Sequence, residues 1–258
     1  MAKSSVTRAA IVSCAVFLGL LGLEVRGVGA YEVQPVSNGG TLQGTVMLKG
    51  EPPAPKQFEL RRYPDRAFCG ALSDGSGFRL LREVNVGQTG GLKDVVVVIE
   101  DISQGKPFAS VDAQVEANVC QFFPFVTIVA QEQGITVTNR DPVFHDIQGY
   151  TYDQAGVDIV LHRPSLKATG TKEMVHLVKG RKVFTMQCGM HPYMQNWGYA
   201  VDNPYYAVTG LEGTFSIGDL PAGTYKVRVW HPTLGVQEHS VAVTAGGTTS
   251  LEVAFEDN

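Results

Sequence analysis

The chain has 258 residues, of which 44% are hydrophobic and 18% charged, and its formal net charge is −4. This composition allows a packed core and argues against intrinsic disorder, while the acidic balance argues against nucleic acid as a partner. The 29 glycines and 13 prolines are typical of many short strands joined by tight turns.

The first 30 residues have the pattern of a secretory signal peptide. Lys3 and Arg8 precede an apolar run, Ala9–Leu23, that is short for a membrane span, and Val28-Gly29-Ala30 offers small residues for cleavage. An uncleaved anchor is the alternative, and a lipid anchor on Cys14 is weaker because the apolar run continues past it. We therefore expect a periplasmic or secreted protein, with no membrane span in its mature form. Its 18 basic and 24 acidic residues give a net charge of −6.

After the signal, the sequence predicts an all-β chain. Candidate strands are short β-branched runs or alternate apolar and polar residues, and no helical period extends over ten residues. The expected strands cover 41–49, 94–100, 126–130, 134–138, 157–162, 173–178, 183–188, 200–201, 214–217, 225–230, 240–243 and 251–255. Two β-sandwiches are the expected architecture.

Two breaks in this pattern suggest domain boundaries. One is Asn203-Pro204 and the other lies near Gly105-Lys106-Pro107. We expect a signal peptide over 1–30, an N-terminal β segment over 31–105, a central β-sandwich over 106–203 and a C-terminal sandwich over 204–258.

Chemistry concentrates on one loop, Cys188–Met194, which carries a thiolate, an imidazole (His191) and a thioether (Met194). Phe184, Met186 and Cys188 share one parity of their strand, so Cys188 can point inward. A second imidazole, His145, lies 43 residues upstream. Two His, one Cys and a weak axial Met are the ligand set of a blue-copper site, whereas Met is a poor ligand for zinc.

Each of these residues has an ordinary structural interpretation when taken alone, and they are proposed as ligands only because they occur together. The remaining histidines and several methionines lack such company, so we expect them to be structural, the methionines in the core. These are His162, His176, His231, His239, Met174, Met186 and Met190. A c-type haem is excluded because Cys-x-x-Cys-His is absent.

Three cysteines remain after export. An oxidising compartment favours pairing two of them, and a metal thiolate at Cys188 leaves Cys69 and Cys120 as the pair. The alternative is that all three are reduced and buried.

Residues 125–199 resemble the cupredoxin family. The Cys-x2-His-x2-Met spacing, with Pro192 after His191, is similar to the ligand loop of amicyanin, and Thr138–His145 resembles the strand before the family's first His ligand. The resemblance implies a Greek-key sandwich that holds one copper ion through His145, Cys188, His191 and axial Met194. It also implies that His191 reaches the surface as the electron port, within an apolar rim that includes Tyr193, while His145 is enclosed.

One departure from that family is Asp146. The family usually has an Asn there, whose side chain bonds across the site and holds the ligand loops together. An ionised Asp cannot donate such a bond, which puts the surroundings of the metal in doubt.

The segment from about Tyr205 resembles a different module, the carboxypeptidase regulatory-like, prealbumin-type sandwich. The resemblance rests on Glu212–Phe215 and Leu220–Tyr225, and the start of the same module is similar to Gly44–Val46 with Gly50–Pro53. We therefore expect the central domain to be inserted into one discontinuous sandwich. Three domains in series are the alternative.

These observations predict an exported mononuclear type 1 copper protein that carries single electrons for redox partner proteins. We do not expect an enzyme, because four ligands leave no open position for a substrate. A periplasmic copper-binding or assembly module is one alternative. A non-redox, partner-binding β-sandwich is the other.

Overall fold

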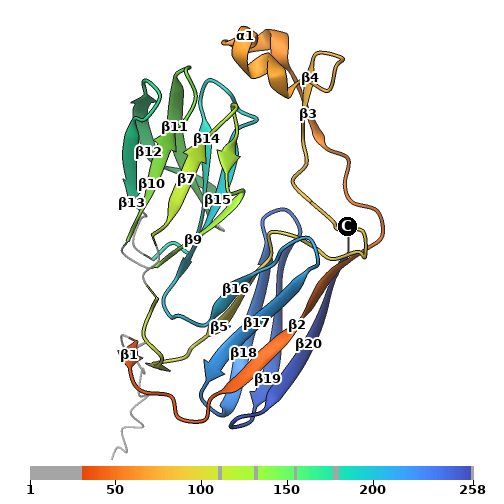
Figure 1. Cartoon of the computed structure of the whole chain (residues 1–258), viewed down its shortest axis with the longest axis vertical. Helices are drawn as coiled ribbons and strands as arrows, with labels where there is room; N and C mark the ends of the chain where they lie inside the picture. Colours follow the sequence, from red (N-terminus) through yellow and green to blue (C-terminus); the bar gives the residue numbers. More distant parts are fainter. Residues whose placement is uncertain (1–30, 110–111, 131–132, 154–155, 177–179, 257–258) are drawn as a thin grey trace, which may run out of the picture.

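The computed structural model describes residues 31–256 except 110–111, 131–132, 154–155 and 177–179, and it is nearly all β. The predicted signal peptide lies outside the described residues. Within the described part of the chain, no helix is long and apolar enough to cross a membrane. The all-β expectation is confirmed (Figure 1).

Twenty strands and three short helices make up the described structure. The strands are β1 (Glu32–Val33), β2 (Gly40–Lys49), β3 (Lys56–Glu59), β4 (Phe78–Leu81), β5 (Val96–Glu100), β6 (Gln104–Gly105), β7 (Gln114–Ala117), β8 (Phe122–Phe123), β9 (Val126–Ala130), β10 (Gly134–Asn139), β11 (His145–Asp153), β12 (Gly156–Leu166), β13 (Lys172–His176), β14 (Val183–Cys188), β15 (Gln195–Val201), β16 (Tyr206–Val208), β17 (Thr214–Leu220), β18 (Gly223–His231), β19 (Gly235–Val243) and β20 (Thr248–Glu256). The helices are η1 (Leu60–Arg62), α1 (Arg66–Cys69) and η2 (Gly70–Leu72).

The middle of the chain forms one sandwich, here called the inserted sandwich (β7–β15). Its sheets have the strand orders β13-β10-β7-β8 and β12-β11-β14-β15-β9. One buried core fills the space between them and includes Val115, Ile135, Ile147 and Phe184. This core also contains Cys188 and Met194.

A second sandwich is built from both ends of the chain and is here called the split sandwich. Its sheets have the orders β16-β5-β18-β19 and β17-β2-β20. β2 runs parallel to the last strand, β20, from Thr41 opposite Thr248 to Lys49 opposite Glu256. β5 pairs with β16 and β18. The strand pairing is therefore that of a discontinuous sandwich with the other one inserted between β5 and β16.

The chain passes between the sandwiches twice, after β5 and before β16, and Asn203 forms hydrogen bonds to both segments. Asn203 lies at the expected Asn203-Pro204 boundary. Its side-chain amide donates to the Ile99 carbonyl oxygen at 2.8 Å, and its carbonyl oxygen accepts from the Tyr205 N–H at 2.9 Å. Because this side chain is buried, the junction is part of the packed structure.

The valine run of β5 packs on both of its faces. Val95, Val97 and Ile99 belong to the core of the split sandwich. Val96 and Val98 face the inserted sandwich in a separate cluster with Tyr199 and Trp230. Burial on two faces explains why this strand lacks the alternation of polar and apolar residues seen in β20.

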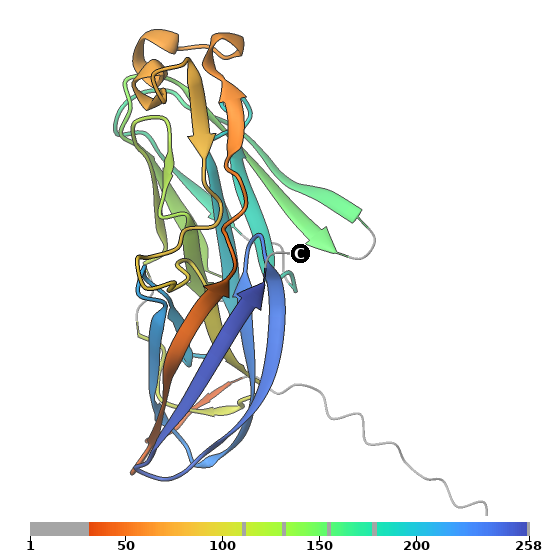
Figure 2. The ribbon, with the colours of Figure 1, turned by 90° about the vertical axis from the view of Figure 1, so that its right-hand side faces the viewer.

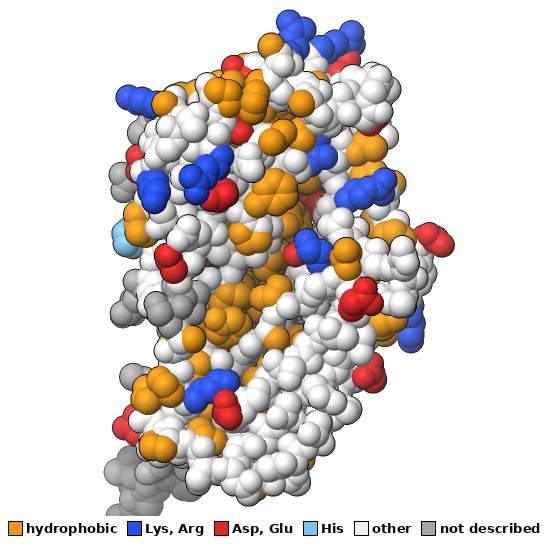
Figure 3. Space-filling model, in the orientation of Figure 1, with side chains coloured by type: hydrophobic (Ala, Val, Ile, Leu, Met, Phe, Trp, Pro, Cys, Tyr) orange, Lys and Arg blue, Asp and Glu red, His pale blue; other side chains and the backbone are white. Residues whose placement is uncertain are grey.

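A third part, here called the cap, comprises residues 56–81 from the start of β3 to the end of β4. The β3–β4 hairpin leaves the split sandwich and carries η1, α1 and η2 to one end of the inserted sandwich (Figures 1 and 2). A cleft of about 960 Å³ separates the hairpin from both sandwiches, and apolar side chains gather along it in Figure 3. Its lining includes Phe122, Phe123, Arg79 and Tyr193.

Sequence periodicity finds most of the longer strands but misses β7, β11, β16 and the cap, and it predicts only the last two residues of β15. β11 buries His145, Ile147, Gly149 and Thr151 in strict alternation, yet glycine and threonine hide that period in the sequence. Met174 was expected in the core and instead is 49% exposed on β13. The expectation fails because β13 lies at the edge of its sheet.

Candidate metal centre

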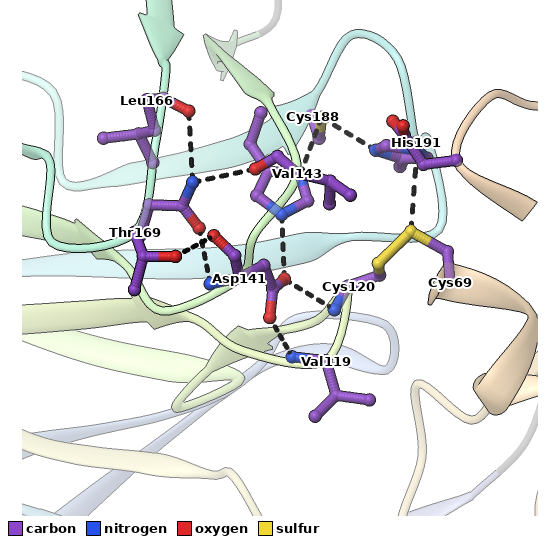
Figure 4. Close-up of polar contacts among 12 residues, drawn as sticks. Cys69, Val119, Cys120, Asp141, Val143, Leu166, Thr169, Cys188 and His191 are labelled. Carbon is purple, nitrogen blue, oxygen red and sulfur yellow. Dashed lines mark hydrogen bonds and ion pairs between the residues drawn. A yellow bond between two sulfur atoms is a disulfide. The ribbon is translucent and has the colours of Figure 1, made fainter. Parts of the chain in front are cut away.

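Cys188 and His191, three residues apart on one loop, meet His145 from 43 residues upstream inside the inserted sandwich. The Cys188 sulfur is 3.8 Å from Nδ1 of His145 and 3.7 Å from Nδ1 of His191. One ligand atom from each residue lies within 4.8 Å of the others. Figure 4 shows Cys188 and His191 facing each other across this point. All three side chains are fully buried.

Strand ends position these residues. β14 terminates at Cys188, and the burial of Phe184, Met186 and Cys188 confirms that they point into the core together. β11 begins at His145 and pairs with β14, with Ile147 opposite Cys188. The imidazole and the thiolate are therefore brought together by adjacent strands of one sheet.

The loop after Cys188 folds back on itself and carries His191 and Met194. The Met194 N–H donates to the His191 carbonyl oxygen at 2.8 Å, and the Cys188 N–H donates to the Met194 carbonyl oxygen at 3.2 Å. Met194 is fully buried in the same core cluster as Cys188. The loop thus places the side chain of Met194 in the same core as Cys188, without solvent contact.

Asp141 fixes the orientation of the His145 ring. Its Oδ2 lies 2.8 Å from His145 Nε2, and both side chains are essentially inaccessible to solvent. A proton on Nε2 is donated to this carboxylate, which leaves Nδ1 as an acceptor facing Cys188. Such carboxylate–histidine pairs commonly orient metal-bound histidines.

The same carboxylate also organises the turn that carries Cys120. Oδ1 of Asp141 accepts from the Val119 N–H at 2.5 Å, and Oδ2 accepts from the Cys120 N–H at 2.8 Å. Val119 and Cys120 both have positive φ, 49° and 51°, which is costly for non-glycine residues. The two charge-assisted bonds offset this cost.

Asn139 holds the connection between β10 and β11. Its amide nitrogen donates to the carbonyl oxygens of Val143 (2.9 Å) and Leu166 (3.1 Å), and its Oδ1 accepts from the Asp141 N–H at 2.8 Å. The Asn139 side chain is completely buried. The position of Asp141, and through it that of His145, is therefore set by the packed scaffold.

His191 is covered by the cap. Its Nε2 lies 3.6 Å from Oδ2 of Asp65 and 3.7 Å from the Cys69 sulfur, and the neighbouring Pro64 backbone acts to raise the pKa of the ring. Tyr193 is 1% exposed and packs edge-on against Phe58 and Tyr63 of the cap.

The expectation that His191 reaches the surface within an apolar rim is therefore wrong. The His191 side chain is 0% exposed, as is that of His145. The cap supplies the contacts at Nε2, and its sequence carries no period that would have predicted this position.

Burial sets the protonation of the three groups. It lowers the pKa of His145, which Asp141 partly opposes, and it lowers the pKa of His191, with the neighbouring His145 acting in the same direction. Burial raises the pKa of the Cys188 thiol, while backbone N–H groups of Asp146, Met190 and His191 act against that rise. Both imidazoles are thus neutral at pH 7 and able to accept a cation, which would stabilise the thiolate.

Asp146 does not bond across the site with its side chain. Its Oδ2 accepts from the Gln148 amide at 3.1 Å, and its main-chain carbonyl oxygen accepts from the Gly189 N–H at 3.0 Å. A Cβ at position 189 would lie 2.5 Å from that Oδ2. The two ligand loops are therefore joined through the backbone, and Gly189 permits their close approach.

The predicted disulfide is confirmed between Cys69 and Cys120, and among the described residues Cys188 is the free cysteine. The bond joins the cap to the turn organised by Asp141 (Figure 4). A geometric group of Cys120, Asp141 and His145 also exists, but Cys120 is occupied in the disulfide and does not offer a thiolate.

The donor set fits a copper ion. Two neutral imidazoles and one thiolate converge in an enclosed site, with a thioether on the same loop. This soft set is typical of copper, whereas structural zinc sites take four Cys or His ligands.

Sequence reasoning missed Asp141, Asn139 and the cap residues Pro64 and Asp65. Asp141 lies four residues before His145, next to a proline, where an Asp commonly serves a turn. No spacing in the sequence links residues 56–81 to the metal loop. The disulfide was the one available signal.

Comparison with known protein families gives a partial match. The family described as polysaccharide lyase family 4, domain II, matches residues 168–251. That match covers less than half of the chain and runs from before β13 into β20, across strands of both sandwiches. No curated protein matches this chain significantly.

Several solved copper proteins are distantly similar in structure. A purple cupredoxin from Nitrosopumilus maritimus has 23% identity over 35% of this chain and 100% of its own, with a TM-score of 0.30. A mutant of amicyanin in its reduced Cu(I) form has 15% identity over 41% and 98%, with a TM-score of 0.30. A Cu-containing nitrite reductase from Thermus scotoductus SA-01 has 18% identity over 37% and 24%, with a TM-score of 0.29. TM-scores this low do not by themselves identify a function.

Proposed function

We propose that this chain is an exported mononuclear type 1 copper protein that carries single electrons and is not an enzyme. The observation that supports the proposal most strongly is the convergence of the His145 and His191 Nδ1 atoms on the Cys188 sulfur, at 3.8 and 3.7 Å. Met194, buried on the same loop, completes the expected ligand set.

A bound copper ion would supply reversible one-electron redox chemistry, and the protein would supply its ligands and surroundings. His145, held by Asp141, is oriented before the metal arrives. Burial of the ligand side chains excludes water, and the backbone N–H groups at Cys188 tune the electron density on the sulfur. A rigid ligand set of this kind changes little between two oxidation states, which favours electron transfer over catalysis.

The test is the visible spectrum of the copper(II)-loaded protein. We expect an intense blue or green band from thiolate-to-copper charge transfer, at one copper per chain. Cys188→Ser should abolish the band while the β-sheet circular dichroism stays unchanged. A colourless copper complex in the unmodified protein would contradict the proposal.

The alternative is a module that stores or delivers copper without carrying electrons. Two observations favour this alternative: the ligand side chains are buried, and the cap covers His191. Both lengthen the path for electrons between the centre and a partner protein. Cyclic voltammetry separates the two, because a carrier shows a reversible one-electron wave and a delivery module releases its metal on reduction.

A further inference from the structure

His191 lies directly beneath the cap, so the outer face of the cap is the protein surface nearest to this ring. The outer ring nitrogen, Nε2, contacts Asp65 and Cys69 of the cap, and the side chain is 0% exposed. The 3.6 Å approach of Nε2 to the Asp65 carboxylate connects the ring directly to the cap. Asp65, the next residue, has a side chain that is 30% exposed. The cap is thus one short peptide segment thick between the imidazole and solvent.

The charge of the cap is opposite to that of the remaining protein. Residues 56–81 hold five basic and three acidic residues, for a net charge of +2. The remaining residues of 31–258 hold 13 basic and 21 acidic residues, for a net charge of −8. An acidic protein therefore presents its positive segment over the metal ligand.

Three arginines carry this charge at the outer surface. The side chains of Arg61 and Arg62 are 75% and 73% exposed, and both pair with the single carboxylate of Glu59. Arg66 is also exposed, and it directly follows Asp65. Basic side chains are visible at the cap end of the molecule in Figure 3.

The same face is hollowed. A recess of about 380 Å³ is lined by Arg61, Arg66, Ser73 and Ser76, with Glu59 as its acidic residue. The arginines can donate to an incoming carboxylate, and the recess gives room for a protruding acidic side chain.

We propose that the outer face of the cap, marked by Arg61, Arg62 and Arg66, is the docking surface for an acidic redox protein. This inference rests on the proposed electron-carrier function and names the partner class and the exit route. The electron passes between partner and centre through Pro64–Asp65 and His191. One partner loses one electron and the other gains it, and no bond or proton is exchanged. Charge complementarity would speed the encounter and orient the partner over His191.

The experiment uses two small oxidants of opposite charge in place of the unidentified partner. The full copper(I)-loaded protein is mixed with hexacyanoferrate(III), an anion, or with tris(phenanthroline)cobalt(III), a cation, and the second-order rates are followed over a range of ionic strength. The test variant is Arg61→Gln/Arg62→Gln/Arg66→Gln. The matched control, Lys49→Gln/Lys182→Gln/Lys226→Gln, removes the same charge from side chains outside the cap, which pair instead with Glu256, Glu100, Asp202 and Glu238.

We expect the cap variant to lower the low-salt rate with the anion by about tenfold and to flatten its salt dependence, with no loss of rate for the cation. The visible spectrum and the reduction potential should stay unchanged, since none of these side chains touches a ligand. An unchanged rate, or an equal fall in the control variant, would overturn the docking surface while leaving the carrier function intact. If the unmodified protein exchanges electrons with neither complex, the carrier function itself fails, and the docking proposal with it.

Discussion

Both sandwiches bury a histidine completely, but the two surroundings differ. In the split sandwich, Nδ1 of His231 accepts from the Thr233 and Leu234 N–H groups, each at 3.2 Å. In the inserted sandwich, the Nδ1 atoms of His145 and His191 face a sulfur instead. Burial therefore does not distinguish a structural histidine from a ligand. The two kinds of histidine are distinguished by the atom that faces Nδ1: a backbone N–H for His231, and a sulfur for His145 and His191.

The source of burial differs as well. His231 lies on β18 inside its own sandwich, beside Phe255 of β20. His191 is buried by a cap that belongs to another part of the chain and is fastened by the Cys69–Cys120 bond. The first kind of burial depends on the core of its own sandwich, and the second on the packing of the cap together with one covalent link.

Removal of that link should have the largest effect. Cys69→Ser/Cys120→Ser loses a cross-link between residues 51 positions apart, which should lower the free energy of unfolding by about 3–4 kcal/mol. Denaturant titration of the metal-free protein measures this loss. Chemical modification of histidine should then become faster at His191 and stay slow at His231. Equal protection of both would show that the cap stays seated without the disulfide.

The pH dependence of stability should reveal His231. Burial lowers the pKa of His231 to about 4 in the folded protein, against an ordinary value of 6.5. The unfolded chain therefore binds the proton more readily, so this contribution is fully present above pH 6.5 and is lost as pH falls towards 4. Between pH 7 and 4.5 the loss should be about 2–3 kcal/mol.

His231→Asn supplies the matched comparison, because an Asn can keep an acceptor near the Thr233 and Leu234 N–H groups. Denaturant unfolding of the metal-free proteins at both pH values should show a smaller loss in the variant. His145 and His191 titrate in both proteins, so their contributions cancel. An identical pH dependence would mean that His231 is not the group responsible.

Loss of the Asp141 carboxylate should weaken copper binding by about 10- to 100-fold, because it orients the His145 ring. Asp141→Asn also removes a buried negative charge that favours Cu(II), so the reduction potential should rise. Competition with a chromophoric chelator measures the affinity, and voltammetry measures the potential. Asp146→Asn is the control, since that side chain contacts Gln148 and no ligand ring. A larger effect in the control would reverse the assigned roles.

The smallest effect is expected for copper binding in His231→Asn. This variant should keep the affinity and visible spectrum of the unmodified protein, whereas His191→Asn should lose both. A spectral change in His231→Asn would show that His231 also affects the copper site and is not purely structural.

The sequence predicts the chemistry of the site better than its surroundings. Ligand residues carry rare side chains at a recognisable spacing, and the alternation of Phe184, Met186 and Cys188 shows which way the thiolate points. Asp141 and Asn139 act through hydrogen bonds to backbone groups whose positions depend on the fold, and polar loop residues give no such indication. The surface position expected for His191 was wrong because the cap approaches from residues more than 100 positions earlier in the chain, which no local pattern encodes.

Strand β5 couples the stability of the two sandwiches, because it packs on both of its faces. Val97 and Ile99 stabilise the core of the split sandwich, and Val96 and Val98 stabilise its contact with the inserted sandwich. Displacement of β5 therefore destabilises both sandwiches. The protein should melt in a single cooperative transition in spite of its two cores. Excision of residues 106–203 would leave Val96, Val98 and Trp230 as a bare apolar strip on the outside of the remaining sandwich, a site for self-association.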